Sequence, residues 1–164
     1  MKKLNIPKKF GPILIVLSIV LVGISMYRTN HPNINSKYYL ASGEEDPSVT
    51  NLNTRKQTKD IREFDFDKFS GRWNIIEFQS TKGNKVKIID NSNITKGKLY
   101  IVVLNSEYKA LAIHKSDGKS TLNLTTHKDG KYIIRIVGQG TCGNLNMKVT
   151  SPIDIHLSHR GVFG

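Results

Sequence analysis

The residues whose side chains could do chemistry include one cysteine in a glycine-rich stretch. Cys142, the single cysteine, lies in Gly138-Gln139-Gly140-Thr141-Cys142-Gly143. Such a turn can present a thiolate to backbone N–H donors, and His114 with Asp117 lies upstream, as in cysteine proteases built on two β-barrels. Because the chain has room for one such barrel, we favour a glycine-permitted bend between two strands. We therefore predict no enzymatic activity, with a Cys142 hydrolase as an alternative.

The histidines do not follow a metal-binding pattern. His156 and His159 are three residues apart, and in an extended strand this spacing points the two rings to opposite faces. A metal site would therefore need ligands from another strand. We predict neither a metal site nor a cofactor, and a single cysteine excludes an intrachain disulfide.

The elements that must position these residues have the two-residue period of β-strands. Turn signals such as Ser116-Asp117-Gly118 and Lys128-Asp129-Gly130 separate short segments rich in apolar residues. The predicted strands cover residues 73–78, 85–89, 98–104, 108–114, 120–126, 132–137, 145–149 and 153–157. This pattern predicts an all-β domain, an antiparallel meander of about eight short strands that forms a small barrel or a sandwich.

The stretch Phe69-Ser70-Gly71-Arg72-Trp73 contains the single tryptophan of the chain. It resembles the first-strand signature of the lipocalin and calycin barrels, in which an aromatic and acidic lead, a glycine, one variable residue and a tryptophan open the first strand. The resemblance implies that Gly71 and Trp73 close the barrel floor. It also implies that an arginine from the last strand packs across the indole ring in a cation–π contact. Arg160 matches this arginine by position, and Arg135 is the second candidate.

The N-terminal residues have the composition of a membrane anchor. Four lysines, Lys2, Lys3, Lys8 and Lys9, precede an uncharged apolar run over residues 10–27. About 18 helical residues extend about 27 Å, which matches the hydrocarbon core of a bilayer. The lysines favour a cytoplasmic N-terminus. We predict an anchor at 1–28 in a single-pass cytoplasmic-membrane protein, with the alternative of a signal peptide whose cleavage follows Gly23 and Ser25.

Residues 29–62 are polar and contain the acidic cluster Glu44-Glu45-Asp46. They predict a flexible linker before a domain at 63–164, although Tyr38-Tyr39-Leu40 is an apolar segment that could contact a partner. The net charge is +12, and the domain carries fifteen basic and nine acidic residues. This balance favours anionic lipid headgroups, anionic polymers or an acidic partner. Nucleic acid is not predicted, because aromatic residues do not alternate with the basic ones.

The predicted function is that of a membrane-anchored, extracytoplasmic interaction module, periplasmic or at the cell surface. A small barrel fills its interior with its own side chains, and a tether keeps the domain near a partner protein in a cell-envelope complex. The alternative is a carrier of a small apolar ligand or lipid. In that case the predicted ligand-binding side chains are those of Ile76, Phe78, Val103 and Ile113.

Overall fold

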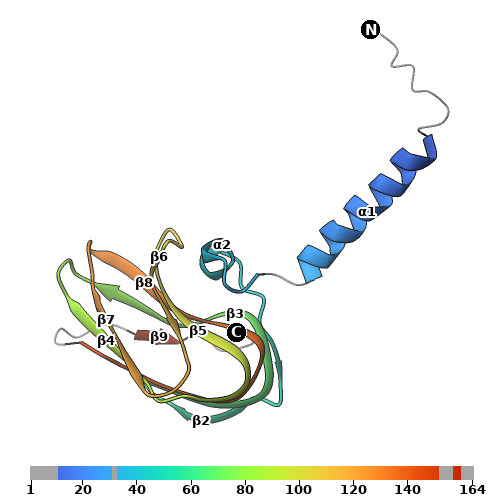
Figure 1. The fold of residues 1–164 in the computed structure, drawn as a ribbon. Helices are drawn as coiled ribbons and strands as arrows, with labels where there is room; N and C mark the ends of the chain where they lie inside the picture. The colour runs from blue at the N-terminus through green and yellow to red at the C-terminus, as the bar shows by residue number, and fades with distance from the viewer. Residues whose placement is uncertain (1–10, 31–32, 152–156, 160–164) are drawn as a thin grey trace. The chain divides into compact units, whose positions relative to one another are not determined.

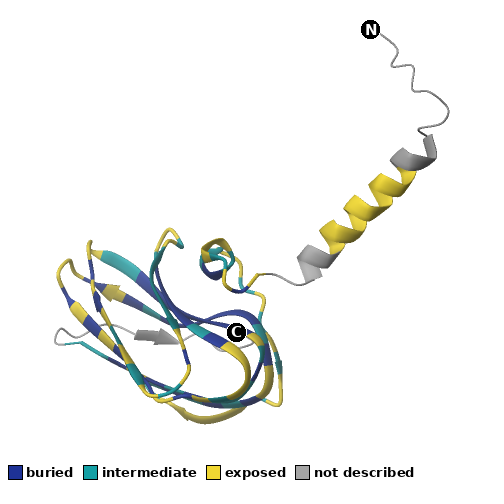
Figure 2. Ribbon diagram, in the orientation of Figure 1, coloured by how far each residue is buried: buried dark blue, intermediate teal, exposed yellow. Residues whose placement is uncertain are grey.

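The computed structural model describes residues 11–30, 33–151 and 157–159 of the chain, which divides into two compact units, Met1–Asn33 and Ile34–Gly164. The first unit contains helix α1 (Gly11–Asn30). Its large apolar side chains between residues 15 and 26 are all exposed, as Figure 2 shows. Within the described part of the chain, no helix combines the length and apolarity that a membrane crossing requires. Part of the predicted anchor, residues 1–10, lies outside the described residues.

The second unit is almost entirely β-structure (Figure 1). It contains one short helix, α2 (Lys37–Ala41), and the strands β1 (Ser48–Thr50), β2 (Asn53–Gln57), β3 (Ile61–Ser80), β4 (Lys85–Asp90), β5 (Asn93–Asn105), β6 (Ala110–Lys115), β7 (Ser120–Thr125), β8 (Gly130–Thr150) and β9 (Leu157–His159). All nine of these described strands belong to one sheet, and every pairing is antiparallel. The predicted all-β, antiparallel class is confirmed.

The order of the strands differs from the predicted meander. The two longest strands, β3 with 20 residues and β8 with 21, pair along most of their length. On its other side β8 pairs with β4 and β5, while β7 pairs with β4 and β6 with β5. Strand β3 is longer than predicted because Phe64 and Phe66 point inward between the polar residues Glu63, Asp65 and Asp67. The two-residue alternation therefore starts well before Trp73.

Glycines allow the long strands to bend near their middles. Gly71 of β3 lies opposite Gly138 of β8, beside a shift in the pairing register. Gly97 of β5 has a φ of +79°, and a Cβ there would overlap the carbonyl oxygen of Gly140. We call this level of the sheet, marked by Gly71, Gly97, Gly138 and Gly140, the crease. Beyond it the sheet turns back, so that the two halves of β3 and of β8 contribute to one apolar core (Figure 1).

A second apolar cluster lies on the outer side of the sheet. Within β5, Ile101 and Val103 point into the core, whereas Val102 and Leu104 point outward. Ile133 and Val137 of β8 belong to the same outer cluster, and Ile34 and Leu40 cover it. The side chains of Val102, Leu104 and Val137 are all 0% exposed as a result.

The start of the domain consequently differs from the predicted boundary at residue 63. Residues 34–57, which the sequence assigns to a flexible linker at 29–62, contain α2, β1 and β2 and belong to the second compact unit. Leu40 from the apolar segment is 2% exposed. Only a few side chains of this segment, among them Ile34 and Leu40, face the sheet, so the segment can be folded and still have a polar composition. Its remaining residues face water or the buried polar groups described below.

Candidate functional site

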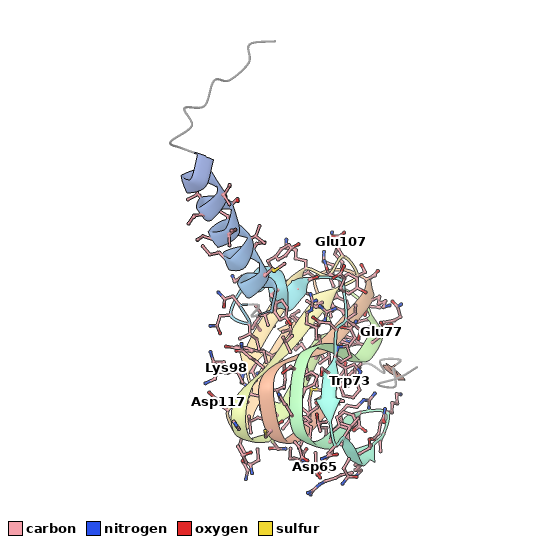
Figure 3. All side chains as sticks on the ribbon, turned by 90° about the vertical axis from the view of Figure 1, so that its right-hand side faces the viewer. Asp65, Trp73, Glu77, Lys98, Glu107 and Asp117 are labelled. Atoms are coloured by element: carbon pink, nitrogen blue, oxygen red, sulfur yellow. The ribbon has the colours of Figure 1, made fainter. Side chains whose placement is uncertain are left out.

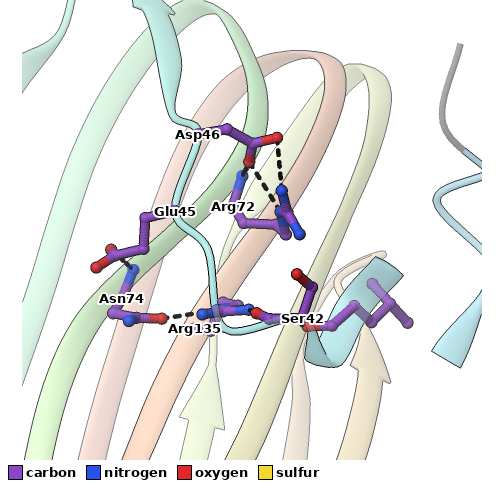
Figure 4. A network of polar contacts seen from close by, with 7 residues as sticks. Ser42, Glu45, Asp46, Arg72, Asn74 and Arg135 are labelled. Atoms are coloured by element: carbon purple, nitrogen blue, oxygen red, sulfur yellow. Dashed lines mark hydrogen bonds and ion pairs between the residues drawn. The ribbon is translucent and has the colours of Figure 1, made fainter. Parts of the chain in front are cut away.

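Residues 34–46, which we call the strap, cross the outer face of the sheet and are held there by charged groups (Figure 4). The Arg72 guanidinium donates two hydrogen bonds to the Asp46 carboxylate, from Nε and Nη2, both at 2.9 Å. The Arg72 N–H donates to the same carboxylate at 2.8 Å, and Asp46 N–H donates back to the Arg72 carbonyl. The guanidinium also stacks on the Tyr39 ring, 4.6 Å from its centroid. Two strap residues thus clamp one arginine of β3.

A second arginine, Arg135 of β8, is fully buried beneath the strap. Its Nε donates to Asn74 Oδ1 at 2.6 Å, and its Nη1 donates to the carbonyl of Ser42. The Asn74 N–H donates to Glu45 Oε1 at 2.7 Å, as Figure 4 shows. Burial lowers the pKa of Arg135, but an arginine remains charged at neutral pH. The buried charge therefore depends on strap carbonyls for part of its solvation, and the network acts as a structural clamp.

Another part of the outer side of the sheet, formed by β4, β7 and the end of β8, is exposed to solvent. We define the open face by the outward side chains of Lys85 and Lys87 on β4, Thr121, Asn123 and Thr125 on β7, and Lys148 on β8, all of them exposed. The pairing register places Lys87 opposite Asn123 on one side and Thr150 on the other. Lys148 Nζ lies 3.8 Å from Asp60, but Lys85 and Lys87 have no ion-pair partner among the described residues. The one acidic residue of β4, Asp90, is buried, so this face is basic.

A pocket of about 260 Å³ lies at the end of the domain away from the crease. Two turns form its walls, one between β5 and β6 and one between β7 and β8, while Leu111 and Tyr132 contribute apolar surface. We call it the mouth pocket. Figure 3 places Glu107, which lines this pocket, at the opposite end of the domain from Asp65.

A serine, a histidine and an aspartate meet beside the core, but they do not form a catalytic relay. His114 Nε2 lies 2.7 Å from Ser120 Oγ and 3.4 Å from Asp90 Oδ2. A Ser-His-Asp relay needs the hydroxyl and the carboxylate on opposite ring nitrogens, and here both approach the same one. Because the three residues come from β6, β7 and β4, the contact instead ties the outer strands together.

The structure does not bring the predicted nucleophile and base together. The hydrogen-bond contact of Cys142 Sγ is with the carbonyl of Gly140 at 3.9 Å, whereas the His114 ring contacts Ser120 and Asp90. Cys142 is paired through β8 with Lys96 near the crease, and His114 is paired with Ile101 further along the sheet. His156 lies outside the described residues. Within the part of the chain that the structure describes, no group of three or more ligating side chains could hold a metal ion.

The four predicted ligand-binding side chains do not line a common cavity. Ile76, Phe78 and Val103 belong to the core and are 0%, 2% and 0% exposed. A cavity large enough for a ligand would leave exposed surface on the side chains around it, so these three are in contact with other side chains. Ile113 lies instead on the outer face with the cluster beneath the strap. Its position follows from the register, because it is paired with Val102, which also points outward.

The residues that resemble the lipocalin signature lie at and beside the crease. Trp73 is 4% exposed and packs against Phe64 and Phe69, with ring centroids 5.3 and 6.5 Å away. Gly71 has a φ of +94°, and the strap backbone at Asp46 passes directly over its Cα. Arg160 lies outside the described residues. Arg135, the second candidate, stacks on Tyr108 at 5.4 Å rather than on the indole ring.

The chain matches no known family model, and no curated protein matches it either. Its functional surfaces therefore have to be inferred from its own geometry.

Sequence reasoning did not identify the strap contacts, the open face or the mouth pocket. One signal was available for the strap, since the acidic cluster containing Asp46 and the Tyr39 segment occur in the same polar stretch. Nothing in the sequence pairs Asp46 with Arg72, because 26 residues separate them. The open face and the mouth pocket depend on which strands are neighbours, and this order is not evident from the strand pattern.

Proposed function

We propose that this chain is a membrane-anchored, extracytoplasmic interaction module that binds an acidic surface of a partner protein through its open face. The observation that carries the proposal is the pair Lys85 and Lys87, exposed on β4 and without ion-pair partners among the described residues. Surfaces of one charge attract complementary partners and speed their association. The flanking Thr121, Asn123 and Thr125 add side chains that can donate and accept hydrogen bonds.

A rigid sheet supports this role better than it supports the carriage of an apolar ligand. The predicted lining residues Ile76, Phe78 and Val103 are packed in the core. The part of the outer side that β5 and β8 form is covered by the strap. The open face is thus a broad sheet surface that needs no rearrangement before it meets a partner, and preorganisation reduces the entropic cost of binding.

The membrane anchor is part of the proposal and is supported by composition. The run over residues 10–27 is uncharged and follows four lysines. The described part of α1 exposes apolar side chains between residues 15 and 26, and such a surface is unfavourable in water. A tether would hold the module at high local concentration beside a membrane-bound partner. The lipocalin resemblance of residues 69–73 stays a prediction.

The test is co-purification in mild detergent from the membranes of cells that make the full-length protein. We expect one protein to be recovered with the wild type and to be lost when Lys85 and Lys87 are both replaced by glutamate. Recovery should also fall as the salt concentration of the wash increases, because salt screens exposed charges. Lys119→Glu, in the turn before β7, makes the same kind of charge reversal at another exposed site and should leave recovery unchanged.

Equal recovery with the wild type and the double variant would refute the role of the open face. The anchor is tested separately by washing the membranes at alkaline pH. We expect the full-length protein to stay with the membrane, and release of a shortened protein that begins after Ser25 would support the signal-peptide alternative instead.

A further inference from the structure

The mouth pocket has walls that are already fixed by side chains. Asn105 Oδ1 accepts hydrogen bonds from the N–H groups of Glu107 at 3.1 Å and Lys109 at 2.8 Å, which shapes the turn between β5 and β6. Across the pocket, the Tyr132 hydroxyl donates to the Lys128 carbonyl at 2.7 Å and accepts from the Lys128 N–H at 3.3 Å. Both turns are therefore held in place before any ligand arrives, a feature that favours binding.

The inner part of the pocket is apolar. Leu111 packs against the core, and the Tyr132 ring stacks on Phe78 with centroids 5.4 Å apart. These two side chains, Leu111 and Tyr132, reach the pocket from β6 and β8. Because Tyr132 is 4% exposed, an apolar group placed there would contact mainly Leu111, which is partly exposed, and would lose its own contact with water.

Two lysines of the lining come from the two turns that form the walls of the pocket. Lys109 and Lys128 both line it, both are exposed, and neither has an ion-pair partner among the described residues. The Lys131 ammonium is paired with Glu77, with Nζ 2.7 Å from Oε2. Asp129 Oδ1 accepts the Lys82 N–H at 2.6 Å, but this carboxylate keeps its negative charge. Glu107 and Asp129 also line the pocket, and both carboxylates oppose the binding of an anion.

We propose that the mouth pocket binds a carboxylate joined to a short apolar group. The carboxylate would lie between the Lys109 and Lys128 ammonium groups, and the apolar group would lie against Leu111 and Tyr132. A volume of about 260 Å³ corresponds to roughly nine water molecules. The ligand is therefore of the size of a short-chain or aryl-alkyl acid, or of the last residue of a peptide. This inference rests on different residues from the open face and does not depend on it.

The experiment titrates the full-length protein in mild detergent with three probes and measures the heat of binding. The probes are hexanoate, a tripeptide that ends in leucine with a free carboxylate, and the same tripeptide with its C-terminus amidated. We expect at least one of the two acids to bind. Binding by hexanoate alone assigns the site to free small acids, and binding by the tripeptide acid assigns it to chain termini.

Matched variants locate the binding. Replacing both Lys109 and Lys128 by glutamine should weaken the binding of the acid roughly tenfold, and Glu107→Gln should strengthen it. Lys119→Gln, outside the pocket, should leave the affinity unchanged. All four positions are exposed, so the variants should keep the fold.

Three results would overturn the proposal. They are the absence of binding by both acids, equal binding of the tripeptide acid and its amide, and an affinity that the Lys109 and Lys128 replacements leave unchanged. None of these results bears on the co-purification test of the open face, because the two experiments vary different lysines.

Discussion

At the scale of single residues, the domain is organised around two arginines on one face of the sheet. Arg72 is paired with a carboxylate that is itself partly exposed, so part of its interaction is screened by solvent. Arg135 is fully buried and depends on Asn74 and the strap carbonyls for its hydrogen bonds. The two positions should therefore respond differently to substitution.

We expect Arg135→Met to lower the free energy of unfolding by about 2–4 kcal/mol. The change leaves Asn74 Oδ1 and the Ser42 carbonyl without their charged donor. Urea titration followed by the fluorescence of Trp73 would measure it. Arg55→Met removes an arginine from an ion pair with Asp65 at the surface, and it should change the urea midpoint of unfolding little. Equal effects at the two positions would contradict the role given to burial.

The ionisation of Asp46 should make the free energy of unfolding depend on pH. Burial alone would raise the pKa of this carboxyl, but the hydrogen bonds from the Arg72 side chain and backbone outweigh it and hold the pKa below the ordinary value of about 3.9. At a pH between the pKa of Asp46 in the folded chain and its higher pKa in the unfolded chain, the unfolded chain binds more protons. The free energy of unfolding therefore decreases as the pH falls below about 4. We expect the Asp46→Asn variant to be less stable at pH 6 and to lose less stability between pH 5 and pH 3. Parallel stability curves for the variant and the wild type would contradict this assignment.

At the scale of elements, the strap and the crease depend on each other. The strap passes over β3 at Gly71, where a side chain would overlap the Asp46 carbonyl oxygen. The left-handed backbone at this glycine also brings Arg72 to the strap carboxylate. A bend in one strand therefore provides the docking site for a segment from a different part of the chain.

Two glycine replacements separate the strain of the backbone from the loss of this contact. Gly83 has a similar φ of +83° but open space around it, so Gly83→Ala should cost only about 1–2 kcal/mol. Gly71→Ala adds the overlap with the strap and should cost at least about 3 kcal/mol. It should also make the strap sensitive to a protease that leaves the wild type intact. Similar losses of stability and similar protease patterns would show that the strap does not rest on Gly71.

At the scale of the whole molecule, the strap closes the second apolar cluster and so completes the domain. Without it, Val102, Leu104, Ile133 and Val137 would face water, and an exposed patch of this kind favours aggregation. The folded unit should therefore begin at Ile34, as its contacts indicate, and not at residue 63.

Truncation tests this boundary directly. We expect a chain that begins at Ile34 to be soluble and to unfold in one cooperative transition. A chain that begins at Pro47 lacks the strap, and it should lose roughly 5 kcal/mol or aggregate, since burial of each large aliphatic side chain contributes about 1.5–3 kcal/mol. The dispersion of amide signals in NMR spectra and the urea midpoint would show the difference. Equal stability of the two chains would contradict the account of the strap.

The sequence by itself determined the all-β class and the positions of most strands. These properties follow from local alternation of apolar and polar residues, and alternation requires no knowledge of which strands are neighbours. Phe64 and Phe66 extended the same pattern, so the length of β3 could also have been predicted.

Only the tertiary structure decided that β3 pairs with β8, that residues 34–46 cover the sheet, and that Lys109 and Lys128 line one pocket. Each of these arrangements joins residues far apart in the chain. Their free energy comes from packing and hydrogen bonds that exist only once the sheet has turned back at its glycines. No local pattern of residues records such contacts, which is why the order of the strands and both candidate binding surfaces had to be read from the fold.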